Sequence, residues 1–502
     1  MSKKALKRCS TGTPGLDEIL RGGLPRERMY LLRGEPGTGK TTLALKFLLE
    51  GVHQGEKCLY ITFSETRDEL EATAESHGWS LDGLELFELT ALEHKLRPDA
   101  QNTIFHPSEI ELAETTQVIT AEVERIRPSR IVFDSASEMR LMAETSLRYR
   151  RQLLALKQYF SGRQCTVLFL DDLTANGEGF QIESIVHGVI GLVKNQSAYG
   201  MDQRQLRVEK LRGVAYFEGG HDCLIRTGGM AVFPRLMASH EHKSYEKESI
   251  ASDVAGLDEL LGGGIDRGTS TLLLGPAGSG KSTITLQFAH AAARRGDKVA
   301  IFSFEESANS IISRSSAFNL DFESLVKRGL VTVRKISPAE VSTGEFADDV
   351  RALVDKHDVK LVVIDSLTGY LHAMPEQKYL ILQMHELLAH LNQRGVATVA
   401  VLTQSGMMGQ MHSQVDLTYL ADTVVITRFF EYRGSVKNAV SVVKKRTGAH
   451  EKTIREFVID GNGLHVGHAL DEFQGVLTGV PRYVGKSAAM LKRGEGPSKE
   501  FP

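Results

Sequence analysis

The sequence predicts an α/β protein made of two tandem copies of one domain, each with a mainly parallel sheet flanked by helices. Two observations lead to this prediction. Five short motifs occur twice, in the same order, along the chain. Within each copy, short apolar runs such as CLYITF, RIVFD and TVLFL alternate with longer segments of helical period. This alternation is typical of a parallel sheet with helices on both faces.

The five repeated motifs define the two copies. Residues 15–23 read GLDEILRGG, and residues 256–264 read GLDELLGGG. GEPGTGKTT is repeated as GPAGSGKST, ITFSET as FSFEES, IVFDS as VVIDS, and EKLRG as KKRTG. The third and fourth motifs stand farther apart in the first copy, so we expect an insertion there, around His94 to Pro107. A sequence repeat of this length indicates a duplicated domain.

The repeat also sets the expected domain boundaries. We expect an N-terminal domain at 1–239, a charged connector at 240–248, a C-terminal domain at 249–469 and a tail at 470–502. In the C-terminal domain one segment keeps a helical period of apolar residues, which should face the sheet. Its apolar residues are Leu380, Met384, Leu387, Leu388 and Leu391.

Composition narrows the class of protein. The 502 residues are 41% hydrophobic and 25% charged, which suits a folded protein with more than one core. The 60 basic and 63 acidic side chains give a net charge of -3, so no global positive field attracts nucleic acid or an anionic membrane. No segment approaches the ~20 apolar residues of a membrane helix, and the opening MSKKALKRCSTGTPG has no apolar stretch behind its basic residues, so we do not expect it to serve as a secretory signal. We therefore expect a cytoplasmic protein whose Cys9, Cys58, Cys165 and Cys223 are reduced and buried.

The second repeated motif has the glycine and lysine spacing of a phosphate-binding loop. Its glycines allow the backbone to curl so that several N–H groups point at one phosphate. The lysine then reaches the β- and γ-phosphates, and the next hydroxyl can bind Mg²⁺. We therefore predict ATP and Mg²⁺ as cofactors, and Thr41 and Ser282 as the metal-binding hydroxyls. The predicted nucleotide-binding residues of the loops are Gly34, Gly37, Gly39, Lys40, Thr41 and Thr42, then Gly275, Gly278, Gly280, Lys281, Ser282 and Thr283.

Acidic residues end two further strands of each copy. Asp134 and Asp365 close apolar runs, so they should lie at the carboxyl edge of the sheet, where they can hold Mg²⁺ through water. Glu305 and Glu306 end the strand that follows the second phosphate-binding loop, where a carboxylate can orient or deprotonate a nucleophile. The first copy has Ser64 and Glu65 at these positions. A serine is no base at neutral pH, so we expect weaker hydrolysis in the first copy.

A pair of basic residues recurs on a late strand of each copy. Lys210 and Arg212 in the first copy correspond to Lys444 and Arg446 in the second. Two residues apart on a strand, the two side chains of each pair share one face. Fixed cations of this kind can neutralise charge on a transferring phosphoryl group, in some proteins from a neighbouring subunit. Solvated surface is the alternative interpretation.

Together these motifs resemble the KaiC family of RecA-like P-loop ATPases. The resemblance covers nearly the whole chain and includes the GLDE segments, both phosphate-binding loops, the EES of the second copy, the K-x-R strands and TGAHEKTIREFVI. It implies two RecA-like P-loop NTPase domains in a double-ring homo-hexamer with ATP at subunit interfaces. It further implies slow hydrolysis in the first domain and autophosphorylation in the second, with KaiB-like or other signalling proteins as partners.

The resemblance also indicates where phosphate would be added. The family's two acceptors, a serine and then a threonine, precede a TDT-like segment. Counting back from Ala421–Thr423, the matching positions are Thr418 and Tyr419. Thr418 keeps an aliphatic hydroxyl and is the expected acceptor, whereas the phenol of Tyr419 is the weaker candidate. Ser413 and Thr423 are nearby alternatives.

Three functions remain open at this stage. The leading one is a KaiC-like ATPase and serine/threonine autokinase in signalling or clock-like regulation. A recombination-type ATPase on single-stranded DNA would need a basic stripe with stacking aromatics, whereas this chain has one tryptophan and a slight acidic excess, so DNA is not expected. A nucleotide-gated scaffold with little catalysis is the third, and Ser64 is its sequence support.

Overall fold

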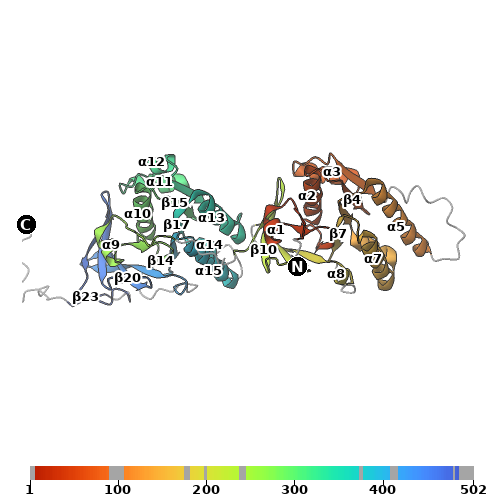
Figure 1. Ribbon diagram of the computed structural model, residues 1–502. Coiled ribbons are helices and arrows are strands. Elements are labelled where there is room, and N and C mark those ends of the chain that lie inside the picture. The colour runs from red at the N-terminus through yellow and green to blue at the C-terminus, as the bar shows by residue number, and fades with distance from the viewer. Residues whose placement is uncertain are drawn as a thin grey trace, which may run out of the picture. The chain divides into compact units, whose positions relative to one another are not determined.

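The computed structural model divides the chain into two compact units, Met1–Arg235 and Leu236–Pro502 (Figure 1). The expected insertion near His94 lies largely outside the residues that the structure describes, as does Ser413. Each unit is an α/β domain with one large sheet and helices on both of its faces. The described residues are 6–89, 107–173, 181–196, 201–236, 245–371, 377–406, 417–478 and 481–484.

The sheet of the first unit has nine strands in the order β11-β10-β9-β8-β3-β7-β6-β4-β5. Strands β5, β4, β6, β7, β3 and β8 run parallel, and β9, β10 and β11 continue the sheet antiparallel. The strands of this unit are β1 (Arg8–Cys9), β2 (Leu24–Pro25), β3 (Met29–Gly34), β4 (Cys58–Thr62), β5 (Leu84–Glu88), β6 (Arg130–Asp134), β7 (Thr166–Asp172), β8 (Gly188–Asn195), β9 (Gln203–Leu211), β10 (Gly220–Arg226) and β11 (Gly229–Phe233).

Helices cover both faces of this sheet because its strands are apolar on both sides. In β3, Tyr30 and Leu32 pack in one cluster with α2, while Met29 and Leu31 pack in another with α5 and α7. Such continuous burial is expected of parallel strands between two helix layers. The helices are α1 (Pro14–Ile19), α2 (Lys40–His53), α3 (Arg67–Ser76), α5 (Pro107–Ile126), α6 (Ala136–Ala143), α7 (Ser146–Phe160) and α8 (Gln181–Ile185).

The second unit repeats this topology, with its nine strands in the order β16-β15-β17-β18-β14-β19-β20-β21-β22. Strands β16, β15, β17, β18, β14 and β19 run parallel, and β20, β21 and β22 continue the sheet antiparallel. The strands are β12 (Ser249–Ile250), β13 (Ile265–Asp266), β14 (Ser270–Gly275), β15 (Lys298–Ser303), β16 (Val331–Lys335), β17 (Val359–Asp365), β18 (Ala397–Thr403), β19 (Thr423–Tyr432), β20 (Ser435–Lys445), β21 (Ile454–Asp460), β22 (Gly463–Ala469), β23 (Phe473–Gln474) and β24 (Arg482–Tyr483).

The amphipathic helix expected in the second unit is α15, and all five of its periodic apolar residues are buried. They pack with α13 and the sheet in a single cluster, while α10, α11 and α12 belong to the cluster on the opposite face. The helices are α9 (Ala255–Leu260), α10 (Lys281–Arg294), α11 (Ala308–Ser316), α12 (Phe322–Lys327), α13 (Thr343–His357), α14 (Leu367–Leu371) and α15 (Gln377–Gln393). The predicted fold class, two tandem RecA-like domains with mainly parallel sheets, is confirmed.

Candidate nucleotide-binding sites

Each phosphate-binding loop joins the central strand of its sheet to a long helix. The first connects β3 to α2, which begins at Lys40, and the second connects β14 to α10, which begins at Lys281. Gly37 and Gly39 have positive φ of 77° and 102°, a conformation that side chains other than glycine rarely adopt. The loop thus curls around the N-terminus of a helix, where free N–H groups and the helix dipole favour an anion.

Both lysines fold back over their own loops. The ammonium of Lys40 donates hydrogen bonds to the carbonyl oxygens of Gly34 and Glu35, both at 3.0 Å. Lys281 donates in the same way to Gly275 O at 3.0 Å and to Pro276 O at 2.7 Å. Burial lowers the pKa of Lys281 to about 8, although nearby Asp365 and Glu305 act in the opposite direction. Each loop therefore holds one buried cation where a phosphate would bind.

The two aspartates predicted to hold Mg²⁺ lie beside the loop hydroxyls. Asp134 ends β6 and Asp365 ends β17, and both peptide bonds that follow them are cis. Burial raises the pKa of each carboxyl group, and hydrogen bonds from Thr41 and Ser282, respectively, act against this shift. A hydroxyl and a carboxylate are the oxygen ligands that Mg²⁺ prefers.

The next residues of the loops, Thr42 and Thr283, are buried in the first turn of their helices. Thr42 Oγ1 lies 3.4 Å from His77 Nε2, a contact that the sequence did not reveal. Among the described residues, no group of three or more His, Cys, Asp or Glu side chains could hold a metal by itself. A divalent cation here would therefore take further ligands from phosphate and water.

Glu65 lies near the first lysine, in a cluster of negative charge. Its N–H donates to Thr62 Oγ1 at 2.9 Å, which fixes the residue just after β4. Burial, followed by the charges of Asp134, Glu69 and Asp172, raises the pKa of Glu65 to about 7, against the effect of Lys40. A carboxylate with a pKa near neutrality can accept a proton from a nucleophile.

The two glutamates of the second site have different surroundings. Glu306, which corresponds to Glu65, is paired with Arg314 of α11 at 2.9 Å and so faces a cation outside the loop. Glu305 Oε1 accepts a hydrogen bond from Ser366 Oγ at 2.8 Å and is close enough to Lys281 to affect its pKa. Of the two, Glu305 is therefore the residue placed to act on a group bound at the lysine.

The structure adds two carboxylates that the motif search missed. Asp171 and Asp172 end β7, between the strands that carry the loop and Asp134. Asp172 Oδ1 forms an ion pair with Lys40 Nζ at 2.6 Å, and Asp171 Oδ1 accepts a hydrogen bond from Ser137 Oγ at 2.7 Å. The apolar run LFL followed by two aspartates has the same pattern that identified Asp134, so the signal was present in the sequence.

The recurring basic residues lie at the amino edge of each sheet, where the parallel strands begin. The phosphate-binding loops lie at the carboxyl edge, where these strands end. Lys210 is on β9, and Arg212 follows its last residue; likewise Lys444 is on β20 and Arg446 follows it. Arg212 and Arg446 therefore lie just past the strands on which they were expected. Lys210 donates to Val186 O at 2.9 Å, and Lys444 to Ala421 O at 2.6 Å. Arg212 and Arg446 donate to the same two segments, through Ser184 O at 3.0 Å and Tyr419 O at 3.2 Å.

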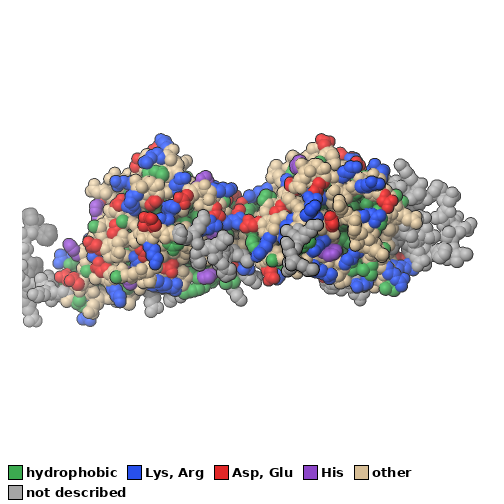
Figure 2. Space-filling model, viewed as in Figure 1, with side chains coloured by type: hydrophobic (Ala, Val, Ile, Leu, Met, Phe, Trp, Pro, Cys, Tyr) green, Lys and Arg blue, Asp and Glu red, His purple; other side chains and the backbone are tan. Residues whose placement is uncertain are grey.

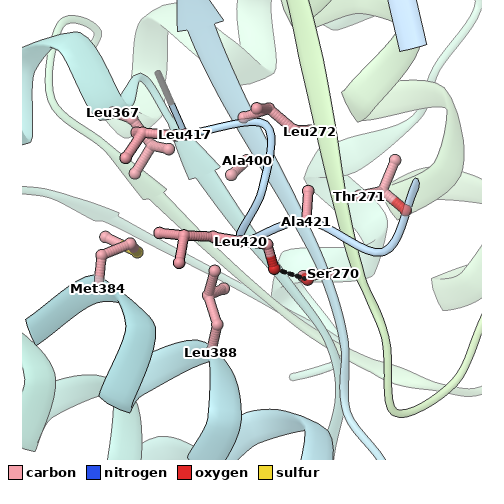
Figure 3. A pocket seen from close by; sticks show the side chains of 10 residues that line it. All are labelled: Ser270, Thr271, Leu272, Leu367, Met384, Leu388, Ala400, Leu417, Leu420 and Ala421. Atoms are coloured by element: carbon pink, nitrogen blue, oxygen red, sulfur yellow. Dashed lines mark hydrogen bonds between the residues drawn. The ribbon is translucent and has the colours of Figure 1, made fainter. Parts of the chain in front are cut away.

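Thr418 and Tyr419 belong to a turn, residues 417–420, at that same edge of the second domain. Leu417 is buried and Tyr419 is 56% exposed. Leu417 and Leu420 line a small apolar cavity together with Met384 and Leu388 of α15 (Figure 3). Ser270 Oγ donates to Leu420 O at 3.3 Å, which ties the turn to the first residue of β14 (Figure 3).

Two phosphate-binding loops, each with a lysine and with a hydroxyl beside an aspartate, are the features of a tandem P-loop ATPase. The family model described as "ATPase: KaiC" matches residues 9–237 and 250–471, so the chain belongs to the KaiC family of ATPases. The family's ligand is ATP, generally with Mg²⁺, and the loops described above fit both. No helix in the described part of the chain is long and apolar enough to cross a membrane.

Curated relatives cover nearly the whole chain. The circadian clock oscillator protein KaiC of Parasynechococcus marenigrum is 26% identical over 486 residues, which is 95% of this chain and 94% of that protein. The protein of the same name from Prochlorococcus marinus is 26% identical over 490 residues, and covers 96% of this chain and 97% of its own length. That of Synechococcus elongatus is 25% identical over 488 residues, with 95% and 92% covered. The resemblance predicted from the motifs is confirmed.

Proposed function

We propose that the chain is a ring-forming ATPase whose second domain phosphorylates Thr418 of a neighbouring copy. The first domain would hydrolyse ATP with Glu65 as the proton acceptor. In the second, the Thr418 hydroxyl would attack the γ-phosphorus and give its proton to Glu305, while ADP leaves. Lys281 would stabilise the phosphates, and Ser282 with Asp365 would hold Mg²⁺.

The position of the basic residues and of Thr418 supports this proposal. Asp422 N donates to Ser270 O at 2.8 Å, so the turn at Thr418 lies where β14 begins. The phosphate-binding loop follows Gly275, where β14 ends. Because a strand rises about 3.3 Å per residue, the six residues of β14 hold these groups ~17 Å apart. Thr418 therefore cannot reach the Lys281 site of its own domain.

The first domain has the same arrangement. Arg212 N donates to His187 O at 2.8 Å, and His187 N donates to Met29 O at 2.8 Å, so Arg212 lies where β3 begins. The loop lies where β3 ends, after Gly34. Basic residues at one edge can act on a nucleotide at the other edge only when the nucleotide belongs to another copy. A head-to-tail homo-oligomer supplies that neighbour, and we propose the hexamer that the family resemblance implies.

The two other functions have less support. On the visible face, Lys and Arg side chains of the described residues are interspersed with Asp and Glu, without the basic stripe that single-stranded DNA requires (Figure 2). We disfavour a scaffold without catalysis because Glu65 and Glu305 each lie close to a loop lysine, where a base could act. We therefore retain the ATPase and autokinase as the proposed function.

Mixing two inactive variants tests the proposal. Lys281→Ala lacks the phosphate-binding cation, and Thr418→Ala lacks the acceptor, so neither alone should become phosphorylated at residue 418. Mixed with ATP and Mg²⁺, they should give phosphate on Thr418 of the Lys281→Ala chain, identified by site-resolved mass spectrometry with one chain isotope-labelled. No phosphate in the mixture, together with phosphorylated wild type, would rule out transfer between copies. Phosphate only at other residues would rule out Thr418.

The assembly itself is tested separately. Multi-angle light scattering of the wild type should show a hexamer with ATP and Mg²⁺ and smaller species without nucleotide. Arg212→Ala combined with Arg446→Ala should lower the rates of hydrolysis and phosphorylation, because both substitutions remove cations from a neighbour's site. A monomer at micromolar concentration in the presence of ATP would contradict the interface model.

A further inference from the structure

The two lysines of the phosphate-binding loops have unequal ionic surroundings. Lys40 is tied to Asp172 by an ion pair of 2.6 Å, and the Asp172 side chain is 36% exposed, so its carboxylate is open to solvent. Strand pairing places Asp172 opposite Gly34, and in the second domain it places Thr403 opposite Gly275. Thr403 is therefore the counterpart of Asp172. Among the described residues, no carboxylate lies within ion-pairing distance of Lys281.

Counting the charges near each lysine shows the same difference. Glu65, Asp134, Asp171 and Asp172 lie near Lys40, whereas Lys281 has Asp365 and Glu305 nearby. Glu306 adds little to the second site because Arg314 neutralises it. The first site therefore has more carboxylates around its lysine than the second, and Asp172 is the one in direct contact with the ammonium group. ATP without a metal is itself highly anionic, so this charge acts directly against its binding.

We propose that Asp172 makes the first site selective for metal-bound nucleotide, a property that the second site has to a smaller degree. This inference rests on the proposed nucleotide binding by both loops. The Asp172 carboxylate is paired with the Lys40 ammonium group. An incoming phosphate has to displace the carboxylate, and the displaced charge then lies beside the phosphates. A divalent cation on the nucleotide neutralises both, whereas a metal-free nucleotide leaves the two anions in contact.

The polypeptide holds Asp172 firmly in this position. Its N–H donates to Ser137 Oγ at 2.9 Å, and Ser137 Oγ donates to Asp171 at 2.7 Å, so the strand end is linked to α6. In the second domain the N–H of Thr403 donates to Thr368 Oγ1 at 3.2 Å, which preserves the backbone arrangement without the carboxylate. Replacing Asp172 by Thr, or Thr403 by Asp, should therefore change the charge beside the lysine while the hydrogen bond of the backbone N–H remains.

Reciprocal substitution tests the inference. In a full-length chain whose second loop is disabled by Lys281→Ala, calorimetry measures ATP affinity with Mg²⁺ and with EDTA. Asp172→Thr and the isosteric Asp172→Asn should each raise metal-free ATP affinity by about tenfold, because the repulsion between the carboxylate and the phosphates is removed, and should change Mg²⁺-ATP affinity less. In a chain disabled by Lys40→Ala, Thr403→Asp should lower metal-free ATP affinity in the second site by a similar factor.

The outcomes separate this inference from the proposed function. If the first site binds Mg²⁺-ATP and neither substitution of Asp172 changes the ratio of the two affinities, the inference is wrong and nucleotide binding stands. If the first site binds no ATP in either condition, nucleotide binding by the first domain is wrong and the inference falls with it. The inference would also be contradicted if Asp172→Thr changed the ratio of the two affinities as expected but Thr403→Asp did not. The carboxylate added to the second site would then have no effect on the binding of metal-free ATP.

Discussion

The two nucleotide sites share a backbone frame and differ in the charged side chains that surround it. Glu65 remains beside Lys40, with its pKa raised by burial to about 7, whereas its counterpart Glu306 is paired with Arg314. Asp134 accepts a hydrogen bond from Tyr60 OH, but Ile301 stands at the matching position near Asp365. Duplication preserved the phosphate-binding loop and changed the carboxylates around it, and it is through these carboxylates that we expect the two sites to differ in chemistry.

The largest expected effect is the difference in phosphorylation of Thr418 between Lys281→Ala and Lys40→Ala. Lys281→Ala should abolish phosphorylation of Thr418, with a loss of at least about a hundredfold, because the loop cation that would hold the transferring phosphates is removed. Lys40→Ala should act mainly through loss of assembly, and phosphorylation should recover at high protein concentration. Phosphate incorporation measured over a dilution series distinguishes the two. Intact phosphorylation in Lys281→Ala would overturn the assignment of the second site.

The next effect concerns the buried ion pair of Arg130 with Glu56 in the first domain. Arg130 is fully buried at the start of β6, and it donates to Glu56, to Ser10 O and to Phe47 O. The second domain has Leu361 at this position. Arg130→Leu should destabilise the first domain by about 3–5 kcal/mol, since Glu56 loses its buried partner. Hydrogen exchange should show the loss in α2 and β6 but not in the second unit.

Arg26→Leu is the matched control for Arg130. Arg26 also pairs with Glu56, but its side chain is 32% exposed, so its loss should cost less than about 1 kcal/mol. Equal effects of the two substitutions would show that burial is not what distinguishes them. Burial alone would raise the pKa of Glu56, but hydrogen bonds from Arg130 and Arg26 hold it below its ordinary value. This stabilisation should therefore be lost as pH falls through the folded-state pKa of Glu56.

A smaller effect is expected in the pH dependence of hydrolysis. With a pKa of about 7, Glu65 is protonated in acid and can accept a proton only above that value. ATP hydrolysis by the Lys281→Ala chain should therefore rise about tenfold per pH unit below pH 7 and then level off. Glu65→Gln should slow hydrolysis and remove this inflection. An inflection that persists in Glu65→Gln would assign the titrating group to another residue.

The smallest effect is optical and specific to the first site. Trp79 is the one tryptophan of the chain, its ring lies 4.8 Å from that of His77, and Lys46 of α2 stands over it at 5.3 Å. His77 in turn contacts Thr42 of the loop. ATP with Mg²⁺ should change the tryptophan emission of wild type and of Lys281→Ala, but not of Lys40→Ala. A change that survives in Lys40→Ala would show that Trp79 does not respond to the first site.

The sequence predicted those features of the fold and the sites that depend on the spacing of residues close together in the chain. The repeat, the alternation of apolar runs and the glycines of the loops specified the fold and both lysines, because these features depend on neighbours in the chain. The ion pair of Lys40 with Asp172 and that of Glu306 with Arg314 join separate elements. Such pairs follow from strand order and helix rotation, which one sequence does not determine. Asp172 itself could have been found, since it ends an apolar strand as Asp134 does.

One edge of each sheet carries the phosphate-binding loop, and the opposite edge carries the basic pair. A contact between unlike surfaces does not close on itself in a dimer; it either completes a ring or continues as a fibre. Because both domains of this chain would use the same kind of contact, both must turn by the same angle from one copy to the next. In the proposed assembly, a substitution that changed this angle in one domain would strain the contacts of the other, so the fusion of the two domains would keep the number of copies equal in both rings.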